Sequence, residues 1–434
     1  MSRLAMLGGP RAVPDGADRD AATGWPVVTP EDERAVLRVL RGGRLTASAA
    51  GEVEVAALER EWAEYVGVAH CVAVGSGTAA LQVALAAAGV GAGDEVVVPA
   101  LTMNATAHAV RQCGAEPVFA DVDADTFTLD PGRVAEALTD RTAALLPVHL
   151  HGLPADMDEL GAAAEARGLV VVEDAAQAHG ATYRGRRAGA LGWAGCFSLH
   201  PSKNLPTCGE GGLITTDSDE LRRAALALRN FGEREPVRTR TYVAHGPGGN
   251  ARLGPVQAAF ARSQLARLPS CAEDRDKAVT DVLARLAALP GLRVPRVPPD
   301  RSHAWHILRL RVVPEELGLD GVGPAAVRAA LHRALRAEGV PVSRYQVAPL
   351  PAHPAFRAPG ADLDDIADRF PVSCHTVDST LCLQRRHLNP AAGPVLAAYA
   401  DGVEKVWDHL DVVRAVAAAS PGRGWREDVE GGGR

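Results

Sequence analysis

Short apolar runs alternate with longer helical stretches through the first half of the chain. The runs include CVAVGS (71–76), DEVVVPA (94–100) and GLVVVEDAA (168–176), and the residues between them have helical spacing, as in 78–90. The runs lack the alternation of a half-exposed strand, as expected for strands buried on both faces of a parallel sheet. The pattern therefore predicts an α/β domain in which crossover helices cover the sheet.

The pattern changes on both sides of this α/β region. Residues 1–30 are rich in glycine and proline and are expected to form an N-terminal arm. We assign the large domain to residues 31–267 and expect one long helix at about 255–289. The following α+β pattern predicts a small C-terminal domain at 268–418. Residues 419–434 have little apolar surface to bury and are expected to be a disordered tail.

Composition narrows the class of protein. The 434 residues are 47% hydrophobic, which is enough for a sizeable core, and the net charge is −7. This charge argues against nucleic acid or an anionic membrane surface as a partner. No apolar run approaches the roughly 18 residues of a membrane span, and the start of the chain lacks an apolar signal segment. Seven scattered cysteines without a C-x-x-C pair indicate reduced thiols, a cytoplasmic location and no metal site.

Lysine is almost absent from the chain. Among 46 basic residues only Lys203, Lys277 and Lys405 are lysines. A primary amine can condense with an aldehyde, which a guanidinium group cannot do. Lys203 lies in the loop sequence SLHPSKNLPTCGEGG and is the candidate Schiff-base lysine of a pyridoxal phosphate enzyme. Taken alone it is more often an ordinary surface lysine, which is the interpretation we prefer for Lys277 and Lys405.

The neighbouring sequence offers partners for such a cofactor. Asp174 ends an apolar strand, where α/β sheets place ligand groups, and its carboxylate could hold the pyridine nitrogen protonated. Gln177 follows three residues later and could reach the ring hydroxyl. The alternative for Asp174 is an acid that only caps the next helix.

A glycine turn between a strand and a helix offers a phosphate cradle. In VGSGTAAL the backbone N–H groups of Gly77 and Thr78 come at a helix N-terminus, which attracts anions, and Ser198 could add a hydroxyl group. A glycine turn is also common as a plain strand-to-helix connection. Only the combination of turn, acid and lysine favours pyridoxal phosphate.

Several motifs together resemble one known family. GSGTAALQVAL, GDEVVVPALTMNATAHAV, VEDAAQAHGATY and FSLHPSKNLPTCGEGGLITTD occur in the order of the DegT/DnrJ/StrS-type aminotransferases, and the similarity covers about residues 4–412. These are fold-type I pyridoxal phosphate enzymes that aminate keto-sugars and cyclitols. The resemblance implies a large α/β domain with a mostly parallel seven-stranded sheet flanked by helices, and a smaller α+β C-terminal domain.

The resemblance also implies roles for single residues. Lys203 corresponds to the Schiff-base lysine, Asp174 to the acid at the pyridine nitrogen and Gln177 to the residue at the ring hydroxyl. Four residues correspond to phosphate contacts, and the last of them is donated across the interface of a homodimer: Gly77, Thr78, Ser198 and Asn250.

Two positions depart from the family pattern. Met103 stands where relatives place an aromatic side chain over the cofactor ring, and a thioether packs differently on that face. Gly249 and Ala251 flank Asn250 where relatives often have aromatic residues. Both changes predict a wider or unusually shaped acceptor pocket.

Further polar residues are candidates for substrate contact. Four histidines at strand ends lack the spacing of a metal-ligand set, but two of them, His151 and His179, are candidates. Arg344 and Tyr345 lie where relatives have a loop that faces the substrate, although a solvated loop is an equal alternative.

The leading hypothesis is an aminotransferase that moves an amino group from L-glutamate or L-glutamine to a keto-sugar, cyclitol ketone or related carbonyl in antibiotic biosynthesis. Its partners would be these small molecules and a second copy of the chain. Two alternatives stay open. One is another pyridoxal phosphate reaction, such as elimination or decarboxylation, and the other is a non-catalytic regulatory protein. Lys203, Asp174 and Gln177 together weigh against the regulator.

Overall fold

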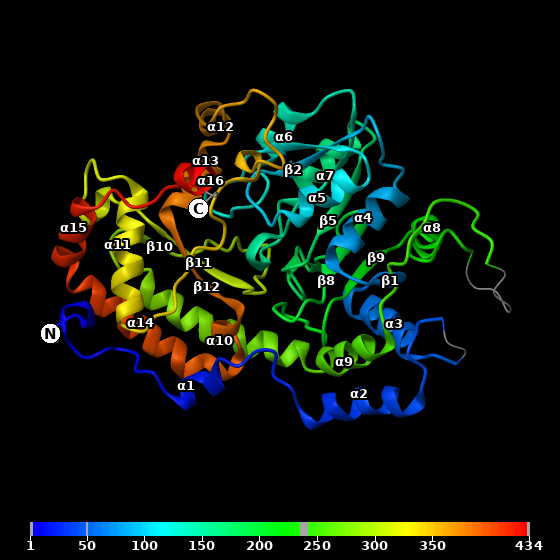
Figure 1. The fold of residues 1–434 in the computed structure, drawn as a ribbon, viewed down its shortest axis with the longest axis horizontal. Coiled ribbons are helices and arrows are strands. Elements are labelled where there is room, and N and C mark those ends of the chain that lie inside the picture. The colour runs from blue at the N-terminus through cyan, green and yellow to red at the C-terminus, as the bar shows by residue number, and fades with distance from the viewer. Residues whose placement is uncertain (1–2, 49–50, 235–241, 432–434) are drawn as a thin grey trace.

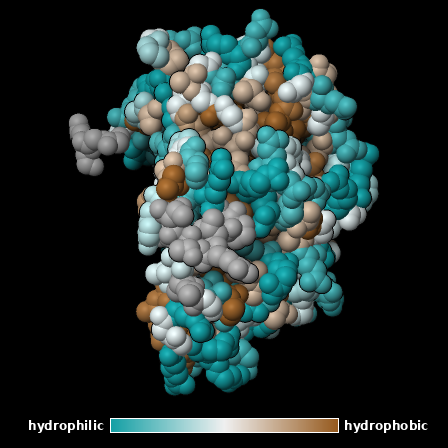
Figure 2. Space-filling model, turned by 90° about the vertical axis from the view of Figure 1, so that its right-hand side faces the viewer, coloured by the Kyte–Doolittle hydropathy of each residue, from teal (hydrophilic) through white to brown (hydrophobic). Residues whose placement is uncertain are grey.

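The computed structural model describes residues 3–48, 51–234 and 242–431. Two lobes lie side by side, with the N-terminal arm running along one edge of both (Figure 1). No helix in these residues is both long enough and apolar enough to cross a bilayer. On the face drawn in Figure 2 the surface is mostly hydrophilic, and apolar side chains lie in scattered groups.

The larger lobe is built on a seven-stranded sheet. Its spatial order is β1 (His70–Val74), β9 (Gly212–Thr216), β8 (Ala194–Ser198), β5 (Val170–Asp174), β4 (Thr142–Leu145), β2 (Glu95–Pro99) and β3 (Glu116–Ala120). The pairs from β8 to β3 are parallel, and only β9 runs antiparallel to both of its neighbours. This sheet confirms the expected mostly parallel architecture.

Helices cover both faces of the sheet. One face is covered by α4 (Gly77–Ala87), α5 (Ala105–Gln112) and α8 (Asp219–Arg229), and the helices on the other face include α3 (Glu54–Val66). In β1, the side chains of Val72 and Val74 pack against the first face's helices, and those of Cys71 and Ala73 pack on the α3 side. Because both faces of each strand are buried, the strands appear in the sequence as continuous apolar runs. Helices α6 (Pro131–Ala137) and α7 (Met157–Glu165) and the small sheet of β6 (Thr182–Tyr183) and β7 (Arg186–Arg187) complete this lobe.

The smaller lobe is α+β, as expected. Its antiparallel sheet has the order β10 (Leu292–Arg293), β11 (Ile307–Val312) and β12 (Thr380–Gln384). A single apolar cluster joins this sheet to the surrounding helices. The helices of this lobe are α11 (Pro324–Ala337), α12 (Leu363–Arg369), α13 (Pro371–Ser379), α14 (Gly393–Trp407) and α15 (Leu410–Ala419).

The prediction of one long helix at about 255–289 is wrong. Two helices, α9 (Pro255–Leu265) and α10 (Leu268–Leu286), occupy this stretch. Pro269 lies in the first turn of α10, where its missing N–H costs nothing, whereas within a continuous helix it would remove a hydrogen bond and clash with the preceding turn.

Both ends of the chain carry more structure than expected. The arm contains α1 (Ala17–Ala22) and leads into α2 (Pro30–Gly42), whose Thr29–Asp32 capping box follows from the sequence. The tail, expected to be disordered, forms α16 (Trp425–Glu430). Trp425 is only 4% exposed and packs in the cluster that contains Leu363 and Phe370. The single buried indole of Trp425 supplies enough apolar surface to dock the tail, which the overall composition of the segment did not indicate.

Candidate active site

A cavity of about 500 Å³ opens beyond the carboxyl ends of β2 and β5, between the two lobes. Parallel α/β sheets place their ligand sites at this edge. The cavity brings together residues from eight separate stretches of the sequence. Those predicted for the site that line it are Gly77, Thr78, Met103, Asp174, Gln177, Ser198, Lys203 and Tyr345.

The turn between β1 and α4 forms an anion cradle at one wall of this cavity. Ser76 caps the helix, and its hydroxyl accepts a hydrogen bond of 3.1 Å from the Ala79 N–H. A Cβ atom on Gly77 would lie 2.6 Å from the Cβ of Ser198, so only glycine allows the helix to begin this close to the end of β8. The free N–H groups of the first helical turn and the Ser198 hydroxyl group border the same space.

The Lys203 amine and the Asp174 carboxyl group face the cavity. Burial lowers the pKa of Lys203, while the charges of Asp174 and Glu210 partly oppose that effect. Burial also raises the pKa of Asp174, although the Thr106 hydroxyl group donates to it at 2.8 Å and stabilises the ionised form. A carboxyl group and an amine whose pKa values are both shifted by burial at one cavity are typical of catalytic sites.

Gln177 is held on two sides. Its side-chain oxygen accepts from the His151 N–H at 2.7 Å, and its nitrogen donates to the Tyr345 hydroxyl group at 3.1 Å. Burial raises the pKa of Tyr345 to about 12, so its phenol stays neutral. His151 therefore supports Gln177 through its backbone, and its ring lies 6.0 Å from the Tyr345 ring without lining the cavity.

Met103 borders the cavity and is 50% exposed. Its sulfur accepts a hydrogen bond of 3.2 Å from the Ala105 N–H, which places the thioether over the first turn of α5. A flexible side chain at an open wall leaves more room than a fixed aromatic ring would.

Besides His151, three predicted residues do not line the cavity. His179 is packed against Trp62 and Phe197 inside the core, where burial lowers its pKa to about 3. Arg344 forms an ion pair with Asp428 of the tail helix. Asn250 is exposed beside the turn that follows β1, so its predicted role toward a partner subunit stays a prediction.

The structure adds residues that sequence reasoning missed. His306, Gln384 and Arg385 line the cavity from the small lobe, and the Thr106 hydroxyl group contacts Asp174. His306 lies in an apolar strand sequence and Arg385 in a run of polar residues, so no local pattern marks them. Their distance of more than a hundred residues from Lys203 hides the proximity.

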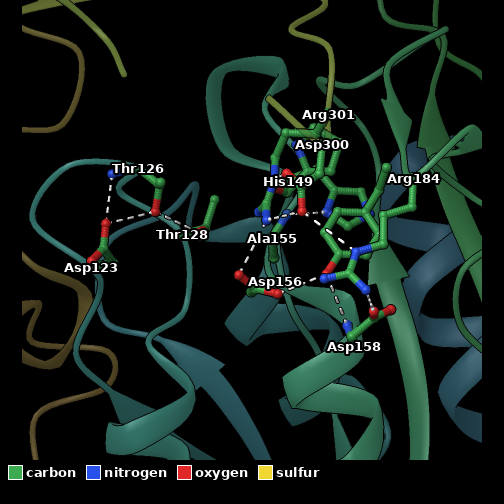
Figure 3. A network of polar contacts seen from close by, with 12 residues as sticks. Asp123, Thr126, Thr128, His149, Ala155, Asp156, Asp158, Arg184, Asp300 and Arg301 are labelled. Atoms are coloured by element: carbon green, nitrogen blue, oxygen red, sulfur yellow. Dashed lines mark hydrogen bonds and ion pairs between the residues drawn. The ribbon is translucent and has the colours of Figure 1, made fainter. Parts of the chain in front are cut away.

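Glu173 points to the opposite face of β5 from Asp174, as the period of a strand requires. It is buried and pairs with His149 at 2.9 Å, and the His149 ring also accepts from the Ala155 N–H at 3.1 Å. Figure 3 shows how this network continues to Arg301, which bonds Asp156 at 3.1 Å. The network fastens the chain before β11 to the large lobe and thereby fixes His306 at the cavity.

Known proteins share this arrangement. The pattern of the DegT/DnrJ/EryC1/StrS aminotransferase family matches residues 26–390. The chain belongs to this family. The aminotransferase is 43% identical over 292 residues to a dTDP-3-amino-3,4,6-trideoxy-α-D-glucose transaminase of Streptomyces venezuelae, covering 67% of this chain and 75% of that protein.

Solved structures of relatives agree with the fold. The ketimine complex of DesV from S. venezuelae superposes with a TM-score of 0.78 at 37% identity, covering 91% of this chain and 99% of that one. The structure of 3-amino-5-hydroxybenzoic acid synthase superposes with a TM-score of 0.80 at 32% identity, covering 92% and 98%. The protein is thus a pyridoxal phosphate-dependent aminotransferase.

The residues of this aminotransferase fit its cofactor. The glycine cradle suits the phosphate because a side chain on Gly77 would close it. Asp174 is buried at the cavity wall, and burial raises its pKa, so a protonated pyridine nitrogen would supply a close counter-charge for its carboxylate. Lys203 lines the cavity beside this cradle, where its amine could condense with an aldehyde carbon.

Proposed function

We propose that this aminotransferase moves an amino group from L-glutamate or L-glutamine to the carbonyl of a keto-sugar or cyclitol ketone, in a cytoplasmic pathway of antibiotic biosynthesis. The observation that carries the proposal is that the half-buried Lys203 and the buried Asp174 carboxyl group line one cavity, which has the volume of a small-molecule site. The Streptomyces venezuelae relative is a transaminase for a dTDP-linked amino-sugar, which supports a nucleotide-linked amino-sugar as the class of product.

Each residue has a defined task in such a reaction. The cofactor, when bound, supplies an electron sink for the carbon that loses its proton. Lys203 would take that proton on Nζ and deliver it to the C4′ carbon of the cofactor, on the other side of the nitrogen that joins cofactor and substrate. Its lowered pKa favours the neutral amine, which is the form that acts as a base.

Asp174 and Gln177 orient the ring. The Asp174 carboxylate, held by Thr106, keeps a proton on the pyridine nitrogen. Gln177 is fixed by His151 and Tyr345 and can donate its remaining N–H to the ring hydroxyl. Both groups are held by hydrogen bonds from the protein itself, which reduces the reorganisation that the reaction requires.

A homodimer would complete the site. Asn250 is exposed and lies beside the chain that leads out of β1, where a second copy could receive it near its own cradle. The proposal therefore assigns one Asn250 to each cofactor phosphate of the neighbouring subunit.

The test is a screen of the purified protein reconstituted with pyridoxal phosphate. Amino donors are mixed with it one at a time, and the visible cofactor band is followed; its loss with L-glutamate or L-glutamine and its return with a dTDP-linked keto-sugar or an inosose support the proposal. Lys203→Ala should abolish both changes, and Lys277→Ala, at a lysine outside the cavity, should alter neither. Release of ammonia or carbon dioxide without an aminated product would identify elimination or decarboxylation instead.

A further inference from the structure

The tail helix α16 packs beside α13, where the two lobes meet (Figure 1). Trp425 lies in one apolar cluster with Leu101 and Val148 of the large lobe and with residues of α12 and α13 in the small lobe. Val148 lines the active cavity, and Leu101 directly precedes Thr102, which lines it too. The helix lies beyond residues 26–390, which match the family pattern, so that pattern assigns it no role.

Polar contacts fix the start of α16 to the small lobe. The Trp425 N–H donates to the Asp378 carboxylate at 2.9 Å. The guanidinium group of Arg328, which is only 2% exposed, donates to the carbonyl oxygen of Arg423 just before the helix. The helix is therefore fastened at its first turn, and Asp428 follows in the next one.

Asp428 links α16 to residues 343–349, a segment without helix or strand that carries Tyr345. Its carboxylate forms an ion pair with Arg344. The side chains of the two partners are only 13% and 22% exposed, so solvent screens their attraction less than it screens a surface pair. The ion pair thus ties α16 to the residue that precedes Tyr345.

The charges around this pair depend on Asp428. Its carboxylate also pairs with Arg423 at 2.9 Å. Burial and the charge of Arg344 lower the pKa of Arg328 to about 10, and the charges of Asp378 and Asp428 oppose that effect. Removing the Asp428 charge would leave three arginines repelling one another across α16, and the segment that carries Arg344 would be displaced.

Tyr345 connects this segment to the cofactor site. Its hydroxyl group accepts from the Gln177 side-chain nitrogen at 3.1 Å, and it lines the active cavity. Backbone hydrogen bonds hold the segment at its two ends, at Ser343 and at Leu350. Between these ends the Arg344 ion pair restrains the backbone next to Tyr345 and therefore the position of its phenol.

We propose that α16 is a positioning element of the active site, which acts through the Asp428–Arg344 ion pair to keep Tyr345 bonded to Gln177. The inference rests on the role proposed above for Gln177 at the cofactor ring. None of the described residues of α16 lines the cavity, so the helix acts through segment 343–349. Without the ion pair Gln177 keeps its contact with the His151 N–H but loses its second anchor. The rate of the reaction should then fall, whereas cofactor affinity, which depends on the phosphate cradle, should change little.

The experiment compares Asp428→Asn with Asp364→Asn in the full chain reconstituted with pyridoxal phosphate. Asp364→Asn is the matched control, because it breaks an exposed ion pair of 2.7 Å between Arg426 of α16 and α12, away from segment 343–349. The single-turnover rate constant for loss of the cofactor band is measured at saturating L-glutamate. It should fall about 5- to 30-fold in Asp428→Asn and less than about twofold in the control. A rate constant does not depend on the folded fraction, so lost stability alone would not change it.

A second readout needs neither cofactor nor substrate. Trypsin cuts after arginine, and in the apoprotein of Asp428→Asn it should cut after Arg344 about tenfold faster than in the natural protein or in Asp364→Asn. The masses of the fragments identify the bond. Asp428→Glu, which keeps the charge, should restore most of both readouts. Arg344→Gln should resemble Asp428→Asn, and the double variant should be no slower than either, because the two residues act as one pair.

The two readouts together decide the outcome. Slower reaction with faster cleavage after Arg344 supports the inference. An unchanged rate constant in Asp428→Asn overturns it, and so does cleavage confined to the tail, after Arg423 or Arg426. If the natural protein reacts with no amino acid, the proposed function fails, and cleavage after Arg344 still tests whether α16 holds the segment. Should Asp428→Asn not fold, Arg344→Gln decides by its rate constant, which must fall as stated.

Discussion

Substitution of Gly77 by alanine should damage the phosphate cradle by a predictable amount. The new Cβ would meet the Cβ of Ser198 at 2.6 Å and its Cα at 3.1 Å. Carbon atoms in contact lie about 3.5–4.0 Å apart, so α4 and the end of β8 must separate by about 1 Å. Such overpacking costs about 1–3 kcal/mol, and the better helix propensity of alanine offsets at most about 1 kcal/mol.

The displacement matters more for the cofactor than for the fold. The N–H groups of the first turn of α4 and the Ser198 hydroxyl group lie on the two sides that would separate. Losing one hydrogen bond to a charged phosphate costs about 1.5–3 kcal/mol, so pyridoxal phosphate should bind about 10- to 150-fold more weakly. Titration of the apoprotein with cofactor, followed by absorbance, measures this change directly.

Gly75→Ala is the matched control within the same turn. There the nearest atoms to the added Cβ would be the carbonyl oxygens of Arg252 and Ala251, at 3.6 and 3.7 Å, which is ordinary contact. It should bind the cofactor nearly as the natural protein does. In the double variant Gly77→Ala/Ser198→Gly, thermal stability should recover in part, because one of the clashing atoms is gone, but cofactor affinity should not. Equal cofactor affinity in Gly77→Ala and Gly75→Ala would refute the close approach of α4 to β8.

The remaining predictions concern the cofactor, the dimer, the open wall and the tail. Borohydride treatment of the reconstituted protein should attach the cofactor to the peptide that contains Lys203, and label elsewhere would exclude that lysine. Mixed dimers of Lys203→Ala and Asn250→Ala subunits should regain activity, because one of their two sites is intact; no recovery despite subunit exchange would contradict a shared site. Met103→Trp should tighten cofactor binding by about 1 kcal/mol and slow the acceptor half-reaction more than the donor half, whereas equal slowing of both would reject the wide-pocket argument. Trp425→Ala should expose the tail to trypsin without preventing cofactor binding, and an unchanged digestion pattern would show that α16 does not depend on its indole.

Local features of this protein follow from its sequence. The Thr29–Asp32 capping box, the glycine turn at Gly77 and the acid at the end of β5 each depend on residues a few positions apart. The hydrophobic periodicity and the turn residues predict such features from the sequence alone, because the hydrogen bonds and steric limits involved lie within one or two turns of backbone. The same locality allowed Glu173 and Asp174 to be placed on opposite faces of one strand.

Only the tertiary structure decided which distant segments meet at the cavity. Trp25, His306 and Arg385 come from the arm and the small lobe, and no periodicity links them to Lys203. His179, equal to His151 as a candidate in sequence, was assigned to the core by the packing of two aromatic rings. The free energy that selects these contacts comes from burying apolar surface across the whole chain. The free energy of burying apolar surface does not depend on how far apart two residues are in the sequence. The local sequence pattern therefore does not predict which distant residues come into contact.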